Sequence, residues 1–600
     1  RDKPVDVDKL LVLTFTNAAA TQMREKIYTA IESLRAERPL DSNLAKQAAL
    51  VHNATITTIH GFCLSILKNH FNEAGLSADF RIADEGESRL LKQDALTEVL
   101  EQAYEKNDPG FVRMAETLAS GKTDRALEDI VLRLYEFSAS SPDPDLWLEH
   151  CLSVYKDFTD EKKDLSELPI LRELFEDIQR ELSDIRESFQ RLKILTEEVY
   201  GLDIYTPTIE ADLLVIRDLS GAADLSELMR RLREAAFVRF GTGGRKGEPK
   251  PEETDKKQLQ ESRDALREQV KQLRERAARF DISENRRLTA DCIPVVSELV
   301  ALTRQFAVCF SQKKRDAGVI DYGDMEHLAI RVLRINDGSV AGEYRELYEE
   351  IYVDEYQDSN MVQETILKAV ARENNLFMVG DVKQSIYGFR LARPDIFIQK
   401  YESYKSGEQG ERIDLNRNFR SRTEVLTAVN EVFSAIMNKD SAGIEYNKEA
   451  ELIPGAEGYE KREEESSPDR TELLLIQREE SSVNEKELEA EVVSERIQEL
   501  VLGYSVKDSN TGGTRKAQYK DIVILLRTAR EWAETFSRVL QKNGIPVMIT
   551  SRTGYFAAYE VAHLLDYLKV IDNPRQDIPL ASALLGAFGK MTDGELASLR

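Results

Sequence analysis

Cysteines are few in this 600-residue sequence, and the four present, Cys63, Cys151, Cys292 and Cys309, include no C-x-x-C pair. With only six histidines in the chain, this spacing argues against a disulfide framework and against a zinc site. Long apolar runs are also missing, since no stretch approaches the roughly 18 to 20 residues that cross a bilayer. We therefore expect free thiols, no membrane segment and a cytoplasmic location.

Basic residues are fewer than acidic ones, with 82 Lys and Arg and 108 Asp and Glu, which gives a net charge of −26. This balance argues against a uniformly basic surface that wraps nucleic acid, although it leaves room for a local basic channel. The length corresponds to three or more domains of about 100 to 200 residues, enough to bury real cores. A disordered chain is therefore excluded.

Short apolar runs typical of buried strands occur in two regions that flank a long helical one. They lie at residues 10–13, 350–354, 376–379, 412–415, 473–476 and 522–526. Helical patterns separate most of these runs, which predicts an α/β fold with parallel sheet covered on both faces. From about residue 85 to residue 300 the pattern is almost wholly helical.

Within the helical region, apolar residues recur at alternating steps of four and three, the seam of a coiled coil. They are Leu171, Phe175, Ile178, Leu182, Ile185, Phe189 and Leu192. An antiparallel helical hairpin within the chain is favoured over a coiled coil between chains.

Two carboxylates, Asp354 and Glu355, directly follow the apolar run at residues 350–353. Metal-assisted nucleotide hydrolysis requires such a pair, because one carboxylate can hold Mg²⁺ while the other orients or deprotonates the attacking water. A strand that ends in Asp-Glu is common, so this pair is a weak signal by itself.

The next run, at residues 376–379, ends in a polar and aromatic segment. Gly380 suits a tight exit from the strand, and Gln384 can hydrogen-bond a phosphate or water. Tyr387, Phe389 and Arg390 place two aromatic faces beside a cation, a combination that suits stacking on unpaired bases. The alternative is a loop that packs its aromatic side chains into a core.

A third run, at residues 412–415, is followed by Arg420, whose guanidinium suits bidentate phosphate contact. Alone it would be a surface arginine.

Taken in order, these segments resemble the motifs of the UvrD-like superfamily 1A helicases, which are DNA translocases. The similar segments are residues 14–24 and 57–63 (DNA-contacting motifs), 354–358 (Walker B), 380–390 (the motif coupling nucleotide to DNA), and 416–422 and 519–527 (second motor domain).

Lys383 stands where simple UvrD and Rep helicases have Asp, which is similar to the RecB and AddA branch of this superfamily. Residues 320–325, 390–397 and 577–584 are also similar to the AddA family. The resemblance implies two RecA-like parallel-sheet motor domains with a large all-α insertion in the first. The implied domains are 1–84 with 300–400 (first motor domain), 85–299 (insertion arm), 401–573 (second motor domain, in part) and 574–600 (the start of another helical insertion).

The resemblance also implies the cofactors ATP and Mg²⁺ and a role for each motif residue. Asp354 holds Mg²⁺ with Glu355 beside it, and Glu355 activates the water. Gln384 senses the γ-phosphate. Arg420 stabilises the transition state, and Phe419 stacks on adenine.

The expected DNA-binding residues are Phe15, Asn17, Thr58, His60, Tyr387, Phe389 and Arg390. His60 is alternatively a packed histidine. The implied partners are single-stranded DNA, duplex DNA ends and an AddB-type nuclease subunit in a heterodimer, in a bacterial cytoplasm, for double-strand-break repair.

The family's phosphate loop, G-x-x-x-x-G-K-[ST], does not occur in the sequence. Residues 120–123 read Ser-Gly-Lys-Thr, but Glu116 replaces the first glycine and the surroundings are helical, so a turn between helices is expected. We expect an internal fragment that does not hydrolyse ATP alone, with a second arginine finger and the nuclease carboxylates beyond residue 600.

Three alternatives remain at this point. One is a simple UvrD or Rep helicase without a nuclease, and a second is a scaffold that binds DNA or a partner without turnover. The third treats the helical region as a separate partner-docking module. The complete reading frame would discriminate between them.

Overall fold

The computed structural model describes residues 5–119, 123–163, 168–241, 251–279, 281–407, 410–456, 469–476, 484–508, 513–549, 558–587 and 589–598. The chain divides into two compact units, each described here by itself. Unit 1 comprises residues 1–413 and 442–444, and unit 2 comprises residues 414–441 and 445–600. The expected turn at residues 120–123 falls mostly outside the described residues.

Unit 1 contains a sheet of four parallel strands in the order β2-β1-β5-β6. The strands are β1 (Leu10–Thr14), β2 (Thr55–Thr58), β5 (Glu350–Val353) and β6 (Leu376–Met378). Leu13 pairs with Val353, which in turn pairs with Met378. Segments more than 330 residues apart in sequence therefore lie side by side in one sheet.

Helices cover both faces of this sheet, as buried parallel strands require. Leu11, Leu13 and Ile351 point into a core shared with α3 (Ile59–Asn69), α14 (Tyr322–Arg334) and α16 (Met361–Val370). Val12 and Ile56 point to the other face, toward α1 (Asn17–Glu37). The alternation of neighbouring side chains between two apolar layers explains why each run reads as continuously hydrophobic.

Shorter elements surround the four-stranded sheet of unit 1. They are η1 (Val7–Lys9), α2 (Ser42–Leu50), α4 (Phe71–Ala74), β3 (Arg81–Ile82), β4 (Val319–Ile320), η4 (Ile335–Gly338), α15 (Ser339–Leu347), η5 (Tyr356–Asp358), η6 (Val382–Gln384), η7 (Gly388–Arg390), α17 (Pro394–Ser403) and η8 (Tyr404–Ser406). β3 and β4 form a separate parallel pair.

The segment at residues 320–325 links the helical region to the sheet. Asp321 caps α14 by accepting the Asp324 N–H (2.8 Å), and the Asp324 carboxylate accepts the Asp321 N–H in return (2.9 Å). The Lys314 ammonium, almost fully buried, contacts both carboxylates at 2.8 and 2.7 Å. The two aspartates therefore hold the end of α13 (Ile282–Asp316) against α14.

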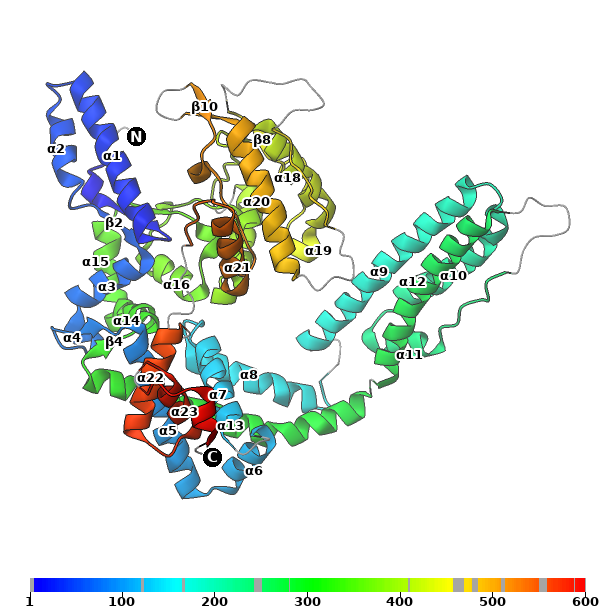
Figure 1. Cartoon of the computed structure of the whole chain (residues 1–600), viewed down its shortest axis with the longest axis horizontal. Helices are drawn as coiled ribbons and strands as arrows, with labels where there is room; N and C mark the ends of the chain where they lie inside the picture. The colour runs from blue at the N-terminus through cyan, green and yellow to red at the C-terminus, as the bar shows by residue number, and fades with distance from the viewer. Residues whose placement is uncertain are drawn as a thin grey trace. The chain divides into compact units, whose positions relative to one another are not determined.

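Among the residues that the structure describes, the region between β3 and β4 contains helices and connecting segments but no strand. They are α5 (Glu85–Lys106), α6 (Pro109–Leu118), α7 (Arg125–Ser138), α8 (Pro144–Thr159), α9 (Pro169–Glu198), η3 (Asp203–Tyr205), α10 (Thr206–Ser220), α11 (Leu225–Glu234), α12 (Glu253–Arg279) and α13 (Ile282–Asp316). One apolar core joins α5, α6, α7 and α13, and a second joins α9 to α12. We call the second group of helices, residues 168–279, the arm (Figure 1).

The predicted seam of α9 is buried within the arm. Leu171, Ile178, Leu182, Ile185 and Phe189 lie in its core, with Phe175 and Leu192 packed against it. Their partners are α10 and α12, which run beside α9 (Figure 1). The antiparallel packing within one chain is therefore confirmed for this seam.

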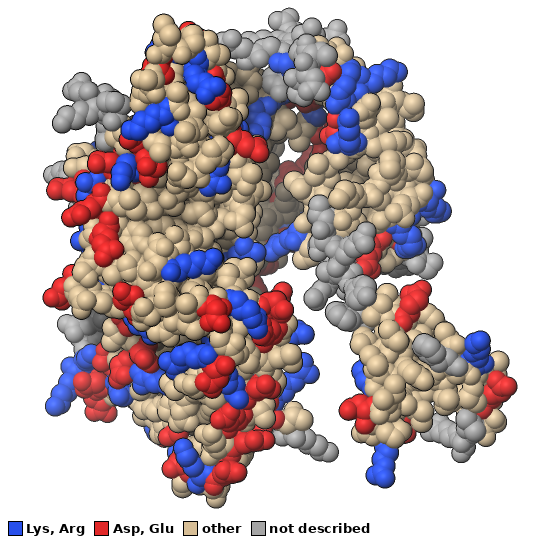
Figure 2. Space-filling model, turned by 90° about the vertical axis from the view of Figure 1, so that its left-hand side faces the viewer, with Lys and Arg blue, Asp and Glu red and all other residues tan. Residues whose placement is uncertain are grey.

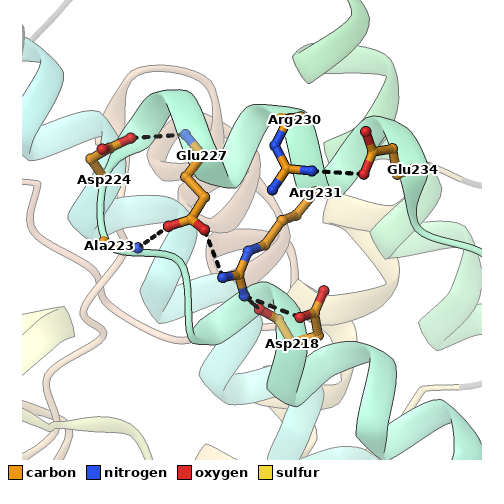
Figure 3. A network of polar contacts seen from close by, with 7 residues as sticks. All are labelled: Asp218, Ala223, Asp224, Glu227, Arg230, Arg231 and Glu234. Atoms are coloured by element: carbon orange, nitrogen blue, oxygen red, sulfur yellow. Dashed lines mark hydrogen bonds and ion pairs between the residues drawn. The ribbon is translucent and has the colours of Figure 1, made fainter.

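Polar contacts fix the turn from α10 to α11 (Figure 3). Asp224 accepts the Glu227 N–H (2.8 Å), while the Glu227 carboxylate accepts the Ala223 N–H (2.8 Å) and pairs with Arg231 (2.7 Å). Arg231 also contacts the Asp218 side chain at 3.1 Å, across the turn. These contacts satisfy backbone N–H groups that the start of a helix leaves without partners.

A fully buried ion pair lies at the centre of the arm. Arg263 of α12 donates through Nε and Nη2 to the two carboxylate oxygens of Asp212 of α10, at 2.5 and 3.0 Å. Nη2 also donates to the Val238 carbonyl oxygen (2.7 Å), and the guanidinium lies 5.6 Å from the centre of the Phe240 ring. The pair therefore joins two helices and the extended segment that follows α11.

Arg263→Met is expected to lower the local free energy of unfolding of the arm by about 3–5 kcal/mol, because it leaves the Asp212 charge buried without its partner. Amide hydrogen exchange in α10 and α12 of the whole chain, followed against urea concentration, measures this change. Arg276→Met is the matched control, since Arg276 pairs with Glu181 at 3.1 Å on the exposed surface of the same helical arm. We expect about 1 kcal/mol or less there, and equal losses in the two variants would contradict the prediction.

One helix among the described residues, α13, is long and apolar enough to cross a membrane by length and composition. The expectation that no stretch reaches this length and apolarity is therefore corrected, while length and composition alone do not place the helix in a membrane. In this fold the helix contributes Leu302, Phe306 and Phe310 to a buried core. Its Arg304 pairs with Asp145 and Glu149 of α8 at 3.1 Å each, so the helix carries paired charge within its length.

Unit 2 contains short strands and several helices. Its elements are β7 (Arg417–Asn418), α18 (Thr423–Ile436), α19 (Lys439–Ala442), β8 (Ile453–Pro454), α20 (Glu485–Gly503), β9 (Ser505–Lys507), β10 (Thr514–Lys516), η9 (Tyr519–Asp521), α21 (Ala529–Lys542), α22 (Tyr559–Asp572), α23 (Asp577–Leu585) and α24 (Asp593–Ser598). β7 and β8 pair in parallel, and β9 and β10 form an antiparallel hairpin.

Three of the predicted strands do not form in the structure. They are residues 412–415, at the boundary between the two units, and residues 473–476 and 522–526 in unit 2. In the last of these segments burial alternates, since Ile522, Ile524 and Leu526 pack on the core of α20 and α21 while Val523 and Leu525 are exposed. Alternation of buried and exposed side chains shows that one face of the segment is buried. It does not provide the neighbouring strand with which a β-strand must pair.

Candidate functional site

The candidate site lies at the carboxyl edge of the four-stranded sheet in unit 1. A cavity of about 420 Å³ opens where β1 and β5 end. Its wall includes residues from both strand ends, from α3, α14 and α16, and from the segment after β6, namely Thr14, Phe15, His60, Glu326, Asp354, Glu355, Asp358, Gln363, Tyr387 and Arg390. Ligands of open α/β sheets bind at this edge, because the polar residues that follow parallel strands converge there.

The two predicted carboxylates follow β5 directly. The Asp354 N–H donates to the Leu13 carbonyl oxygen (2.9 Å), and the Asp354 carboxylate accepts the Glu355 N–H (3.1 Å). Glu355 has φ 53° and ψ 42°, a left-handed conformation that costs energy for a residue other than glycine. Backbone strain of this kind is often found at functional sites.

Burial and neighbouring negative charge raise the pKa values of two carboxyl groups here. The pKa of Asp354 is raised mainly by burial and then by the Glu355 charge. The pKa of Asp358 is raised to about 6 by the same two causes. A nearby cation would favour the charged forms of both groups.

The donor set fits Mg²⁺, which binds through one or two protein carboxylates and completes its shell with water and phosphate oxygens. Asp354 and Glu355 supply such oxygens. Within the described part of the chain, no group of three or more His, Cys, Asp or Glu side chains could hold a metal ion by itself. This agrees with a shared shell rather than with an all-protein metal cage.

The segment after β6 carries the predicted Gln384. Asp381 caps η6 by accepting the Lys383 N–H (3.0 Å), and its carboxylate also accepts the Gln384 side-chain N–H (2.8 Å). Gln384 is exposed and does not line the cavity. The structure therefore holds Gln384 near the site without placing it in the cavity wall.

Four predicted DNA-binding side chains form one cluster at the edge of the cavity. The Phe15 and Tyr387 ring centres are 4.8 Å apart, and those of Tyr387 and Phe389 are 5.9 Å apart. The Arg390 guanidinium lies 5.2 and 5.7 Å from the latter two rings. Phe389 is 78% exposed, so the alternative in which this segment buries its aromatic side chains in a core is wrong for that residue.

The remaining predicted DNA-binding residues are placed differently from one another. His60 lines the cavity, with its Nε2 atom 3.4 Å from Glu326 Oε1 and its ring 5.7 Å from the Tyr322 ring. Thr58 is buried and caps α3 by accepting the Gly61 N–H (3.2 Å). Asn17 lines a second depression of about 330 Å³ beside β2.

Phe419 and Arg420 belong to unit 2, where they follow β7. Asn418 accepts the Arg420 N–H (2.9 Å) and the Ser421 N–H (2.8 Å), which fixes the turn after the strand. Phe419 is 70% exposed and packs closely over Gly455, where an added Cβ would lie 2.9 Å from the ring. The turn therefore presents both side chains after β7, whereas the sequence predicted the preceding strand at residues 412–415, which are not a strand in the structure.

Charge in the cavity wall is mainly negative, since Asp354, Glu355, Asp358 and Glu326 face it together with the guanidinium of Arg390. On the face drawn in Figure 2, the described Lys and Arg residues are interspersed with Asp and Glu. The negative wall suits a ligand that brings a cation into the cavity.

Sequence reasoning assigned no role to Gln357, Asp358, Glu326 or Gln363. Glu326 is buried and accepts from the Gln363 side chain at 2.9 Å. Gln357 and Asp358 belong to the same five-residue motif as Asp354 and Glu355. Their position in this motif is the feature of the sequence that could have indicated a role at the site.

Comparison with known proteins gives the family context for this geometry. A model of the UvrD/REP helicase N-terminal domain matches residues 1–405, and a model of the UvrD-like helicase C-terminal domain matches residues 413–600. These matches confirm the predicted α/β class with two motor domains and a helical insertion.

Similar bacterial proteins are each named as the A subunit of an ATP-dependent helicase/nuclease. One from Alkaliphilus oremlandii is 37% identical over 614 residues, which are 99% of this chain and 50% of the relative. One from Bacillus pumilus is 38% identical over 627 residues, which are 100% of this chain and 50% of the relative. The chain spans about half the length of these relatives, and the predicted resemblance to the AddA branch is confirmed.

Proposed function

Because this chain belongs to the UvrD-like helicase family, we propose that it is the motor of an ATP-driven DNA helicase and translocase. The motor would work in a helicase–nuclease complex that processes double-strand-break ends for recombinational repair. The observation that carries the proposal is the cavity at the sheet edge, since carboxylates suited to nucleotide hydrolysis and aromatic residues suited to DNA line the same wall.

Each motif residue has a proposed role in hydrolysis. Mg²⁺, held by Asp354 with Glu355 beside it, would neutralise phosphate charge. Glu355 would take a proton from the attacking water, and Gln384 would contact the γ-phosphate. In unit 2, Arg420 would stabilise the charge of the transition state, and Phe419 would stack on adenine.

Single-stranded DNA is proposed to bind Phe15, Tyr387, Phe389 and Arg390 by stacking and phosphate contact, with His60 beside them. Asn17 and Thr58 are also proposed to contact the DNA backbone. Thr58 in addition caps the start of α3. ATP binding and hydrolysis would close and reopen the two motor domains, and each cycle would advance the strand.

The relatives are named as one subunit of a larger enzyme, which supports a heterodimer with an AddB-type nuclease subunit on duplex DNA ends. We propose a bacterial cytoplasmic location, because chromosomal break repair takes place there. The nuclease carboxylates would belong to the part of the relatives that this chain does not span.

The test compares ATP hydrolysis by the 600-residue chain and by the full-length protein, each with Mg²⁺ and with or without single-stranded DNA. We expect DNA-stimulated turnover from the full-length protein. We expect none from the chain alone, because its sequence has no phosphate loop to cradle the β- and γ-phosphates. Robust turnover by the chain alone would contradict the residue assignment.

The same assays separate the alternatives. A full-length protein that unwinds DNA but does not degrade it in the presence of its partner would be a simple UvrD or Rep helicase. DNA binding without any ATP turnover by the full-length protein would favour a scaffold.

A further inference from the structure

Gln357 connects the candidate catalytic carboxylate to the segment that carries the DNA-binding aromatics. Its side chain is 1% exposed. Nε2 donates to Glu355 Oε2 at 2.7 Å, and Oε1 accepts the Asp381 N–H at 3.0 Å. One amide group therefore bridges the end of β5 and the loop after β6.

The partners permit only one orientation of this amide. The Asp381 N–H can only donate, so the amide oxygen must face it, and the amide nitrogen must face Glu355. The carboxylate of Glu355 can accept such a bond at Oε2 and keep Oε1 available. Gln357 thus determines which Glu355 oxygen remains available for a substrate water.

The loop approaches Gln357 too closely for any side chain at residue 380. A Cβ atom on Gly380 would lie 2.4 Å from Gln357 Oε1 and 3.2 Å from the backbone nitrogen of Gln357. Beyond Gly380, the Asp381 carboxylate holds Gln384 at 2.8 Å. The contacts from Glu355 through Gln357 and Asp381 to Gln384 are therefore continuous.

The backbone around Gln357 is fixed by other contacts. The Tyr356 N–H donates to the Val379 carbonyl oxygen (2.9 Å), and the Arg393 N–H donates to the Ser359 carbonyl oxygen (2.9 Å). The Tyr356 hydroxyl donates to the buried Glu364, whose carboxylate also lies 3.0 Å from Lys400. A change in the loop would therefore reach Glu355 through the side-chain bridge.

We propose that Gln357 is a positioning residue that aligns the Glu355 carboxylate and couples it to the loop of residues 380–390. DNA that contacts Tyr387, Phe389 and Arg390 would shift the loop, and the bridge would then change how Glu355 faces the attacking water. This inference rests on the proposed ATPase function. The inference adds to that function a residue that couples ATP hydrolysis to DNA binding.

The first measurement is amide hydrogen exchange of residues 380–384 in the 600-residue chain, which needs no ATP turnover. Gln357→Met keeps the side-chain length but removes both hydrogen bonds, so exchange should become about tenfold faster. Gln47→Met is the matched control, because Gln47 donates to Asp6 (2.7 Å) and accepts the Val7 N–H (2.9 Å) far from the loop. Unchanged exchange in Gln357→Met would overturn the inference.

The second measurement is ATP turnover by the full-length protein. Gln357→Met should lower the DNA-stimulated kcat by about tenfold or more and leave the KM for ATP within about threefold, a split that general destabilisation would not produce. Gly380→Ala would place a Cβ atom 2.4 Å from Gln357 Oε1 and force that side chain to move while keeping its amide group, so it should reduce stimulation by DNA more than basal turnover. This second variant keeps the test informative if Gln357→Met does not fold.

Failure of the inference and failure of the proposed function give different results. Normal DNA stimulation in both variants would overturn the coupling role while the proposed function stands. Absence of turnover in the unsubstituted full-length protein would overturn the proposed function, and the inference with it.

Discussion

Glu355→Gln in the full-length protein is expected to lower DNA-stimulated ATP turnover by about 10²- to 10⁴-fold, the range for loss of a general base. An amide cannot take a proton from water at neutral pH. It can still accept the hydrogen bond from Gln357 Nε2, so the local network should survive. Nucleotide affinity should stay within a few-fold of the original, which equilibrium binding of a fluorescent ATP analogue would measure.

Glu349→Gln is the matched control for this change. Glu349 precedes the same strand at its opposite end, where it is half-exposed and lies 3.5 Å from Arg372. Its loss should leave turnover unchanged. Turnover that survives Glu355→Gln would show that another group activates the water, and Asp358, on the same cavity wall, would be the next candidate.

The sheet of unit 1 could be predicted because its strands are buried on both faces. Residues 10–13 and 351–353 read as continuous apolar runs, and polar residues follow each run at the carboxyl edge. Parallel strands bring these ends together, so Phe15, Asp354 and Tyr387 meet although they are far apart in sequence. The convergence follows from topology and needs no detail of side-chain packing.

Other parts of the site depend on contacts that a pattern does not specify. Thr58 and Asn17 belong to similar motifs, yet Thr58 is buried as a helix cap while Asn17 lines a separate depression. The bridge by Gln357 depends on the distance between two loops, and the sequence contains no measure of that distance. The strands expected in unit 2 fail for a related reason, since a short apolar run does not specify a neighbouring strand with which it can pair.

The aromatic cluster leads to the largest expected effect on DNA. Tyr387→Ala combined with Phe389→Ala is expected to weaken binding of single-stranded DNA by about 2–6 kcal/mol, from the stacking free energy of about 1–3 kcal/mol per base. The rings are suited to stacking because Phe389 is 78% exposed and Arg390 lies over both. Fluorescence anisotropy of a labelled oligothymidine, at one fixed salt concentration, measures the change.

The chain should remain folded after the same double substitution, because it removes the ring contacts of Tyr387 with Phe15 and Phe389, about 0.5–1.5 kcal/mol each, and the contacts of Arg390 with both rings at the exposed edge of the cavity. Phe377→Ala is the matched control, since Phe377 is a half-exposed aromatic on β6 that contacts Tyr352 rather than the cluster. It should leave DNA affinity unchanged. If the double variant unfolds at a much lower temperature while the folded fraction binds DNA normally, the aromatic side chains serve packing, and the DNA site must be sought elsewhere on unit 1.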